Sequence, residues 1–179
     1  MARTTFQGPV RSLAGMYNQG PASVVAITAS TTLNPVDHGG RILSVGGTLA
    51  ADITLTLPTI DASTNPVTSG PGQDPSTTNN QGVTYTIWVP TTIATSSLKI
   101  GTDGTDKYIG TIFGVDTDSS NALVAYTAAA SNDYINFNGG TTGGVAGTWV
   151  QIYAIAALKY MVNGVALGTG TVATPFANS

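Results

Sequence analysis

The chain has 179 residues, of which 41% are hydrophobic and 8% are charged, and its formal net charge is −3. This length suits one domain, and the hydrophobic fraction is high enough for a core. All nine acidic residues are Asp, and the scarcity of Glu, Lys and Arg beside abundant Thr, Asn and Gly excludes a helical bundle, while the negative charge argues against nucleic-acid binding.

Residues 1–22 carry few apolar side chains, and Gly8-Pro9, Gly15 and Gly20-Pro21 interrupt them. Neither a helical nor a strand periodicity is sustained there. The sequence therefore predicts an extended N-terminal arm over residues 1–22, followed by one β-domain over residues 23–179.

The first predicted strands are short apolar runs at residues 23–28, 41–45 and 53–57, and the third alternates strictly until Pro58. Residues 61–82 are different, because they contain three prolines and only Ala62 and Val67 as apolar residues. We expect this segment to be a long loop that faces solvent. A loop that contacts a partner is the alternative.

After the loop, a strand is predicted at residues 84–89, which Pro90 closes. Further strands, separated by Gly, Asn, Asp or Ser, are predicted at residues 98–100, 108–115, 122–127, 134–137 and 148–157. Asn163-Gly164 predicts a type I′ hairpin turn between strands at 159–162 and 165–167. Residues 154–161 fit a strand or a short helix. About ten short strands with frequent turn signals are typical of an all-β sandwich or barrel-like domain.

The two tryptophans, Trp88 and Trp149, lie within apolar strands. We expect them to anchor the core, because large aromatic side chains contribute most when they are buried. An exposed position, where they could stack on sugars, is the alternative.

The sequence offers little for catalysis or metal binding. There is no Cys, and the one histidine, His38, follows Asp37 directly. Adjacent residues of an extended chain point to opposite sides, so we expect His38 to be a hydrogen-bonding turn residue rather than a catalytic base. Residues 116–121 resemble the start of a calcium loop, but Asn121 and Thr127 stand where an EF-hand has Gly and Glu. We expect no enzyme activity, no cofactor and no metal site.

The longest apolar run, residues 154–158, is far below the roughly 20 residues that cross a bilayer, so we expect no membrane contact.

Several segments, in their order along the chain, resemble small virion proteins of tailed bacteriophages, in particular head decoration (cement) proteins and some fibre modules. These segments are residues 3–13 (RTTFQGPVRSL), 39–43 (GGRIL), 53–58 (ITLTLP), 82–89 (GVTYTIWV) and the closing GTWV to YMVNG at 147–164. The resemblance implies a non-enzymatic structural protein, a homotrimer that binds the major capsid protein on the outer surface of the virion. A tail-fibre or receptor-binding β module that contacts host surface glycans is the alternative, and a secreted carbohydrate-active protein is a more distant one.

The arm is the segment that we expect to contact the capsid. Residues 1–41 hold three Arg and one Asp, a net +2, whereas residues 42–179 hold three Lys and eight Asp, a net −5. Arginine suits bidentate pairing with carboxylates of a partner. The arm's apolar side chains have no predicted strand or helix that would bury them. The alternative is that the arm wraps onto neighbouring copies of the same chain. The predicted capsid-contact residues are Arg3, Phe6, Val10, Arg11, Leu13, Met16 and Tyr17.

Overall fold

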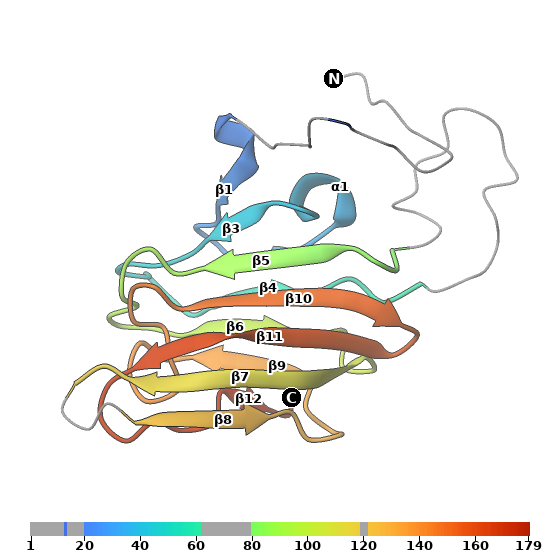
Figure 1. Cartoon of the computed structure of the whole chain (residues 1–179). Coiled ribbons are helices and arrows are strands. Elements are labelled where there is room, and N and C mark those ends of the chain that lie inside the picture. The colour runs from blue at the N-terminus through green and yellow to red at the C-terminus, as the bar shows by residue number, and fades with distance from the viewer. Residues whose placement is uncertain (1–12, 14–19, 62–79, 119–121) are drawn as a thin grey trace, which may run out of the picture.

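The computed structural model describes residues 13, 20–61, 80–118 and 122–179, which form two stacked β-sheets (Figure 1). The seven-stranded sheet contains, in spatial order, β1 (Val24–Ala26), β3 (Ile42–Ser44), β5 (Thr84–Trp88), β10 (Trp149–Ala156), β11 (Lys159–Gly168), β7 (Lys107–Asp116) and β8 (Leu123–Thr127). The five-stranded sheet contains β12 (Phe176–Ala177), β9 (Tyr134–Phe137), β6 (Leu98–Gly101), β4 (Ile53–Thr56) and β2 (Thr31–Thr32). The prediction of an all-β, sandwich-like domain is confirmed. The two-residue strands β2 and β12 were not predicted.

The first six strands alternate between the two sheets. β1, β3 and β5 lie side by side and parallel in one sheet, and β2, β4 and β6 do the same in the other. The chain thus winds three times around the core before β7, and each of these coils contributes one strand to each sheet. Later strands complete the sheets, because β10 pairs antiparallel with β5 and β9 pairs antiparallel with β6.

The core lies between the sheets and follows from the alternation of apolar residues along the strands. Ile53 and Leu55 of β4 point inward while the threonines between them point outward, and β5 and β10 show the same alternation. Side chains of successive strand residues point to opposite faces, so one apolar set fills the interior. The largest fully buried side chains include Tyr85, Tyr108, Tyr160, Phe137, Leu43 and Ile87.

The predicted hairpin turn at Asn163-Gly164 is wrong. Both residues lie inside β11, where they pair with Gln151 and Val150 of β10. A Cβ atom on Gly164 would lie 2.3 Å from the Trp149 carbonyl oxygen, so the glycine permits a close approach of two strands rather than a turn. The turn that joins β10 to β11 lies at residues 157–158, where Leu158 has a φ of 63°. Residues 154–161 therefore form strand, turn and strand, with no helix.

Two predicted features fall largely outside the described residues. Of the seven predicted capsid-contact residues, only Leu13 is described, and it is 86% exposed. Residues 62–79 of the predicted loop are outside as well, but the base of that loop is described. There the buried Asn80 accepts a hydrogen bond from the Asp61 backbone N–H at 2.9 Å and donates one to the Thr59 carbonyl at 2.8 Å. These bonds close the base of the loop against the domain.

Candidate functional site

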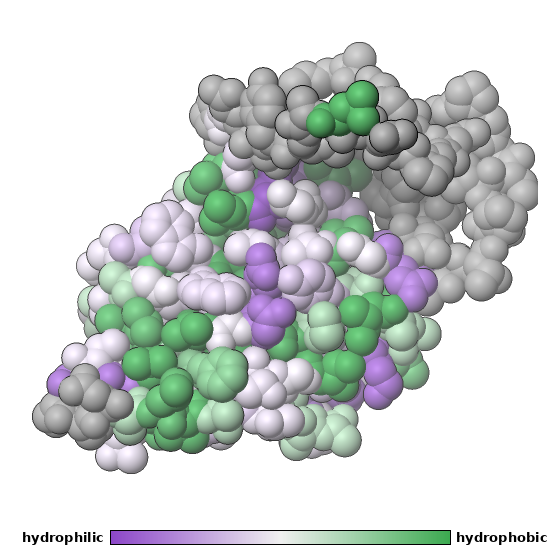
Figure 2. Space-filling model, viewed as in Figure 1, coloured by the Kyte–Doolittle hydropathy of each residue, from purple (hydrophilic) through white to green (hydrophobic). Residues whose placement is uncertain are grey.

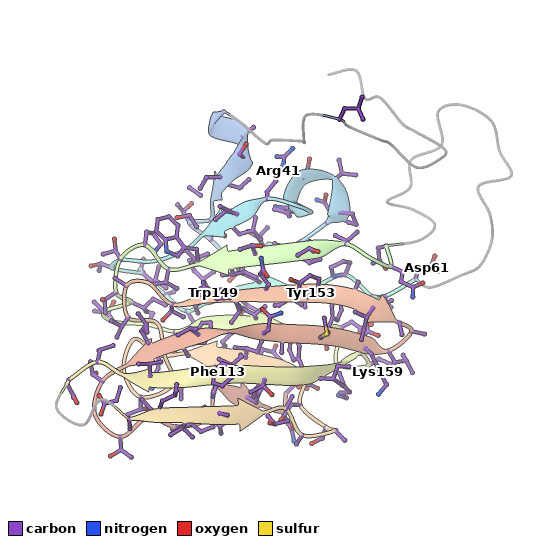
Figure 3. The ribbon with its side chains drawn as sticks, in the orientation of Figure 1. Arg41, Asp61, Phe113, Trp149, Tyr153 and Lys159 are labelled. Atoms are coloured by element: carbon purple, nitrogen blue, oxygen red, sulfur yellow. The ribbon has the colours of Figure 1, made fainter. Side chains whose placement is uncertain are left out.

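The outer face of the seven-stranded sheet carries a row of apolar and small side chains that crosses every strand. Strand register places these residues side by side, and we refer to them as the aromatic row: Ala26, Ser44, Trp88, Trp149, Val165, Phe113 and Ala125. Trp88, Trp149 and Phe113 are 40%, 37% and 45% exposed. Figure 3 shows Trp149 and Phe113 on this face. No charged side chain belongs to the row.

The expectation that Trp88 and Trp149 anchor the core is wrong. They are direct cross-strand neighbours on β5 and β10. Ile87 precedes Trp88, Val150 follows Trp149, and both point into the core, so the two tryptophan side chains share the outer face. Backbone bonds at Val89 and Thr148 make the tryptophan pair a non-hydrogen-bonded one, in which side chains stand closest. The alternation along each strand carries this signal: Trp88 has the same parity as Thr84 and Thr86, and Trp149 has the same parity as Gln151, so each tryptophan belongs to the polar side of its strand.

A second row on the same face is apolar on β1 and β3, polar on the other five strands, and also without formal charge. Register places Val24, Ile42, Thr86, Gln151, Asn163, Thr111 and Thr127 next to one another. Within it, the Oε1 atom of Gln151 accepts a hydrogen bond from the Tyr153 hydroxyl at 2.7 Å. Figure 2 shows apolar surface over β7 and β8 and hydrophilic residues over the middle of the sheet. The face therefore offers apolar area and neutral hydrogen-bonding groups.

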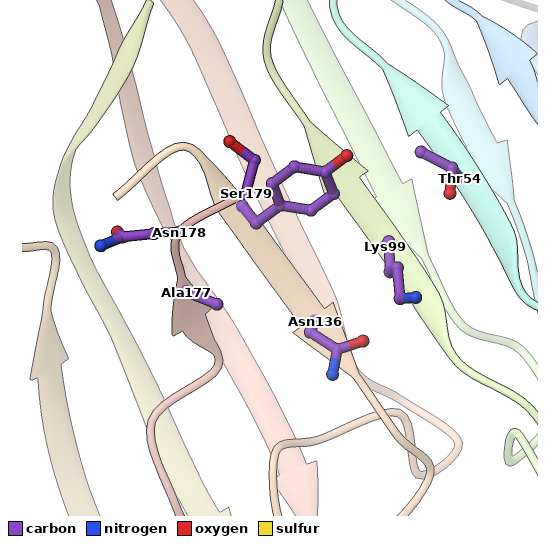
Figure 4. A pocket seen from close by; sticks show the side chains of 7 residues that line it. Thr54, Lys99, Asn136, Ala177, Asn178 and Ser179 are labelled. Carbon is purple, nitrogen blue, oxygen red and sulfur yellow. The ribbon is translucent and has the colours of Figure 1, made fainter. Parts of the chain in front are cut away.

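The opposite side of the molecule, the outer face of the five-stranded sheet, holds a shallow pocket of about 340 Å³ (Figure 4). Thr54, Lys99 and Asn136 form one row across β4, β6 and β9, and Tyr134 and Ala177 belong to the next row. Asn178 and Ser179 complete the lining. The phenol end of Tyr134 lies over Gly101, because a Cβ on that glycine would be 2.9 Å from the Tyr134 Cζ. The pocket is thus lined by an aromatic ring, by side-chain amides and by hydroxyl groups.

The charges at this pocket compensate one another. Lys99 Nζ lies 2.9 Å from Asp52 Oδ2, and both side chains are exposed. The hydrogen bond from Lys99, together with the Ser97 backbone N–H, holds the pKa of Asp52 below its ordinary value, and the bond to Asp52 raises the pKa of Lys99. The Oδ1 atom of Asn136 is buried, and no described group donates to it. The ion pair therefore adds no net charge to the pocket, and the Asn136 Oδ1 atom, although unpartnered, is not exposed to it.

Asp133 fixes the C-terminal wall of this pocket. Its carboxylate accepts hydrogen bonds from Lys107 Nζ at 2.8 Å, from the Ser179 backbone N–H at 2.7 Å and from the Ser179 hydroxyl at 3.0 Å. Burial opposes ionisation, but these donors outweigh it, so the pKa of Asp133 lies below its ordinary value. The buried carboxylate holds residues 177–179 beside β9.

Asp106 is a fully buried carboxyl in the loop between β6 and β7. Its Oδ2 accepts a hydrogen bond from the Ile60 backbone N–H at 2.9 Å, whereas no described group donates to its Oδ1. Burial raises the pKa of this carboxyl. Because its side chain has no access to solvent, we assign it no ligand.

The structure does not bring the candidate catalytic residues together. His38 closes the single helical turn α1 (Pro35–His38), and its Nδ1 accepts a hydrogen bond from the Asn34 backbone N–H at 3.0 Å. Asp37 bonds to the Asn34 side chain instead. The prediction of a hydrogen-bonding turn residue is confirmed. Among the described ranges, no three His or Asp side chains stand close enough to hold a metal ion. Residues 119–121, part of the segment that resembles the start of a calcium loop, are outside those ranges.

Comparisons with known proteins give no relative: no family model matches the chain, and no curated protein or solved structure matches it. In the part of the chain that the structure describes, no helix has the length and apolar character that a bilayer crossing requires. Any assignment of function therefore depends on the surfaces described above and on the sequence motifs. The sequence did not reveal these surfaces, because both depend on which strands become neighbours.

Proposed function

We propose that this chain is a non-enzymatic structural protein of a tailed-phage virion, which binds the major capsid protein on the outer surface of the head and stabilises the shell. The observation that carries the proposal is the aromatic row, which crosses the outer face of the seven-stranded sheet and contains no charged side chain. Protein interfaces are depleted in charge and enriched in aromatic side chains at their centres, and a large exposed apolar patch on a soluble domain is typical of a partner-binding surface.

The resemblance of the N-terminal segment to decoration proteins supports the same proposal. Arg3, Arg11 and the arm's apolar residues would bind beside the sheet face, with the arginines pairing with carboxylates of the capsid protein. A protein that binds only the assembled lattice stabilises it by mass action, so its effect is a binding free energy multiplied over many copies. The resemblance implies three copies around a threefold axis, but lattice binding does not depend on that number.

Binding to particles that lack this protein tests the proposal. The intact chain should sediment with such particles, and electron microscopy should show added density on the head surface. Deletion of residues 2–19 separates the arm from the sheet face: loss of coating by a folded truncated chain identifies the arm as an anchor. If the intact chain does not bind heads, or if its density appears only at the tail, the proposal is wrong.

A tail-fibre or receptor-binding module is the second candidate, and the pocket of the five-stranded sheet favours it. A hydroxylated ring could pack beside Tyr134 and hydrogen-bond to the Asn136 side chain, which lines the same pocket, and the compensated charges suit a neutral ligand. Screening the free chain against neutral and acidic glycans tests this candidate. Binding that Asn136→Ala removes and that Trp149→Ala leaves intact would support it; no binding by any glycan would reject it.

A further inference from the structure

The edge strand β8 differs from the other three sheet edges. A sheet edge presents unpaired backbone N–H and C=O groups, and natural proteins protect such edges by shortness, charge or proline. β1 has three residues, and β2 and β12 have two each, so these edges are short. β8 has five residues, LVAYT, with neither charge nor proline. Figure 1 shows it at the border of the seven-stranded sheet.

The outward backbone groups of β8 belong to Leu123, Ala125 and Thr127. Bonds from Asp116 N–H to the Ala122 carbonyl and from Ala128 N–H to the Gly110 carbonyl flank the β7–β8 ladder. Bonded and non-bonded pairs alternate along an antiparallel ladder, so the even-numbered residues of β8 bond to β7 and the odd-numbered ones face away. No described residue bonds to these outward groups, and Leu123 is 66% exposed.

We infer that β8 pairs with β8 of a second copy of this chain, antiparallel and across a twofold axis at Ala125. In that register Leu123 faces Thr127 of the second copy, Val124 faces Tyr126, and Ala125 faces itself. Aromatic and β-branched side chains form favourable cross-strand pairs, small alanines meet at the axis, and no like charges oppose each other. An isologous contact needs this self-complementarity. The two seven-stranded sheets then form one continuous sheet. This inference does not depend on the proposed function, and a pair differs from the trimer that the resemblance implies.

A single cysteine tests the register, because the native chain contains none. Opposed residues of a bonded antiparallel pair have Cα atoms about 5.5 Å apart, which a disulfide can bridge. Ala125→Cys should therefore give a covalent dimer on mild oxidation. Leu123→Cys is the matched control: its two copies would be four residues apart along the strands, about 13 Å, which is too far. Equal cross-linking of both variants, or none at Ala125→Cys, overturns the inference.

Light scattering of the unmodified chain gives a second readout. We expect the mass of two chains, and Ala125→Lys should weaken the association at least tenfold, because it places two lysines directly opposite each other. Ala125 is exposed, so the melting temperature of the separated chain should stay the same, and Ala125→Ser should still pair. A monomer in the unmodified chain, or a trimer whose mass Ala125→Lys leaves unchanged, overturns the inference.

Discussion

The two sheets bury their inner faces in the same way, but their outer faces differ. The seven-stranded sheet presents the aromatic row, whereas the five-stranded sheet presents threonines, the Lys99–Asp52 ion pair and the Asn136 amide. Single exposed aromatic side chains are common, but two tryptophans and a phenylalanine in one row are unusual on a strand face that meets only water. The outer residues, rather than the core, therefore distinguish the apolar outer face from the polar one.

We first compare one substitution on the outer face of each sheet by its effect on binding to particles. Trp149→Lys should weaken binding to particles that lack the protein by about 100-fold, because a lysine would become buried at the centre of an apolar contact. Thr54→Lys on the five-stranded sheet is the matched control and should change binding less than about threefold. Co-sedimentation over a range of concentrations measures both. Equal losses would show that the two faces do not differ in function.

One glycine in each sheet can be replaced by alanine to compare how closely neighbouring groups approach it. Gly164→Ala should lower the free energy of unfolding by about 3 kcal/mol, since the new Cβ would meet the Trp149 backbone oxygen, which cannot move alone. Gly101→Ala should cost less than about 1 kcal/mol, because the Tyr134 ring can shift. Thermal and urea unfolding measure both values. Gly164→Asn is diagnostic, because a type I′ turn tolerates Asn whereas this strand contact does not.

Asp133→Asn tests how firmly the pocket wall on the five-stranded sheet is held. We expect a loss of about 2 kcal/mol in the free energy of unfolding at neutral pH, since three donors lose a charged acceptor. The folded-state pKa of Asp133 is lowered, so its stabilisation is present above the unfolded pKa and is lost as the pH falls through the folded pKa. Urea unfolding from neutral pH to below pH 4 should show a smaller acid loss in the variant. An identical acid profile in both proteins contradicts the assignment.

The smallest effect is expected from Lys99→Met at the pocket rim. An exposed ion pair contributes little to stability, so the melting temperature should not change measurably. The pKa of Asp52 should rise toward its ordinary value, because the largest cause that lowers it is the hydrogen bond from Lys99. An NMR titration of Asp52 measures the shift. An unchanged pKa would mean that the pair does not form in solution.

The strands themselves could be predicted from the sequence, because alternation and turn residues are local signals. Residues 53–57, which alternate strictly, and residues 84–89 are each closed by a proline and predict strands, and β4 and β5 lie there. Asn163-Gly164 misled the prediction for a physical reason. β10 and β7 bond β11 on both sides, and this tertiary pairing overrides a turn preference.

The candidate surfaces could not be predicted, because they depend on which strands become neighbours. The aromatic row joins residues of seven strands spread from Ala26 to Val165. The pocket brings Thr54 and Lys99 beside Asn136 by a parallel and an antiparallel pairing. The order of parallel coils leaves no signal in a single sequence, since each strand carries the same alternation whichever strand it adjoins.

The position of β10 has a consequence for the synthesis of the chain. β10 lies between β5 and β11 at the middle of its sheet, but its residues follow those of β5 by some 60 positions. While the first three coils emerge from a ribosome, β5 would be an open edge whose final neighbour does not yet exist. Contacts so distant in sequence slow folding and leave β5 open to pairing with other chains. We therefore expect the domain to fold only once its C-terminal third has been made.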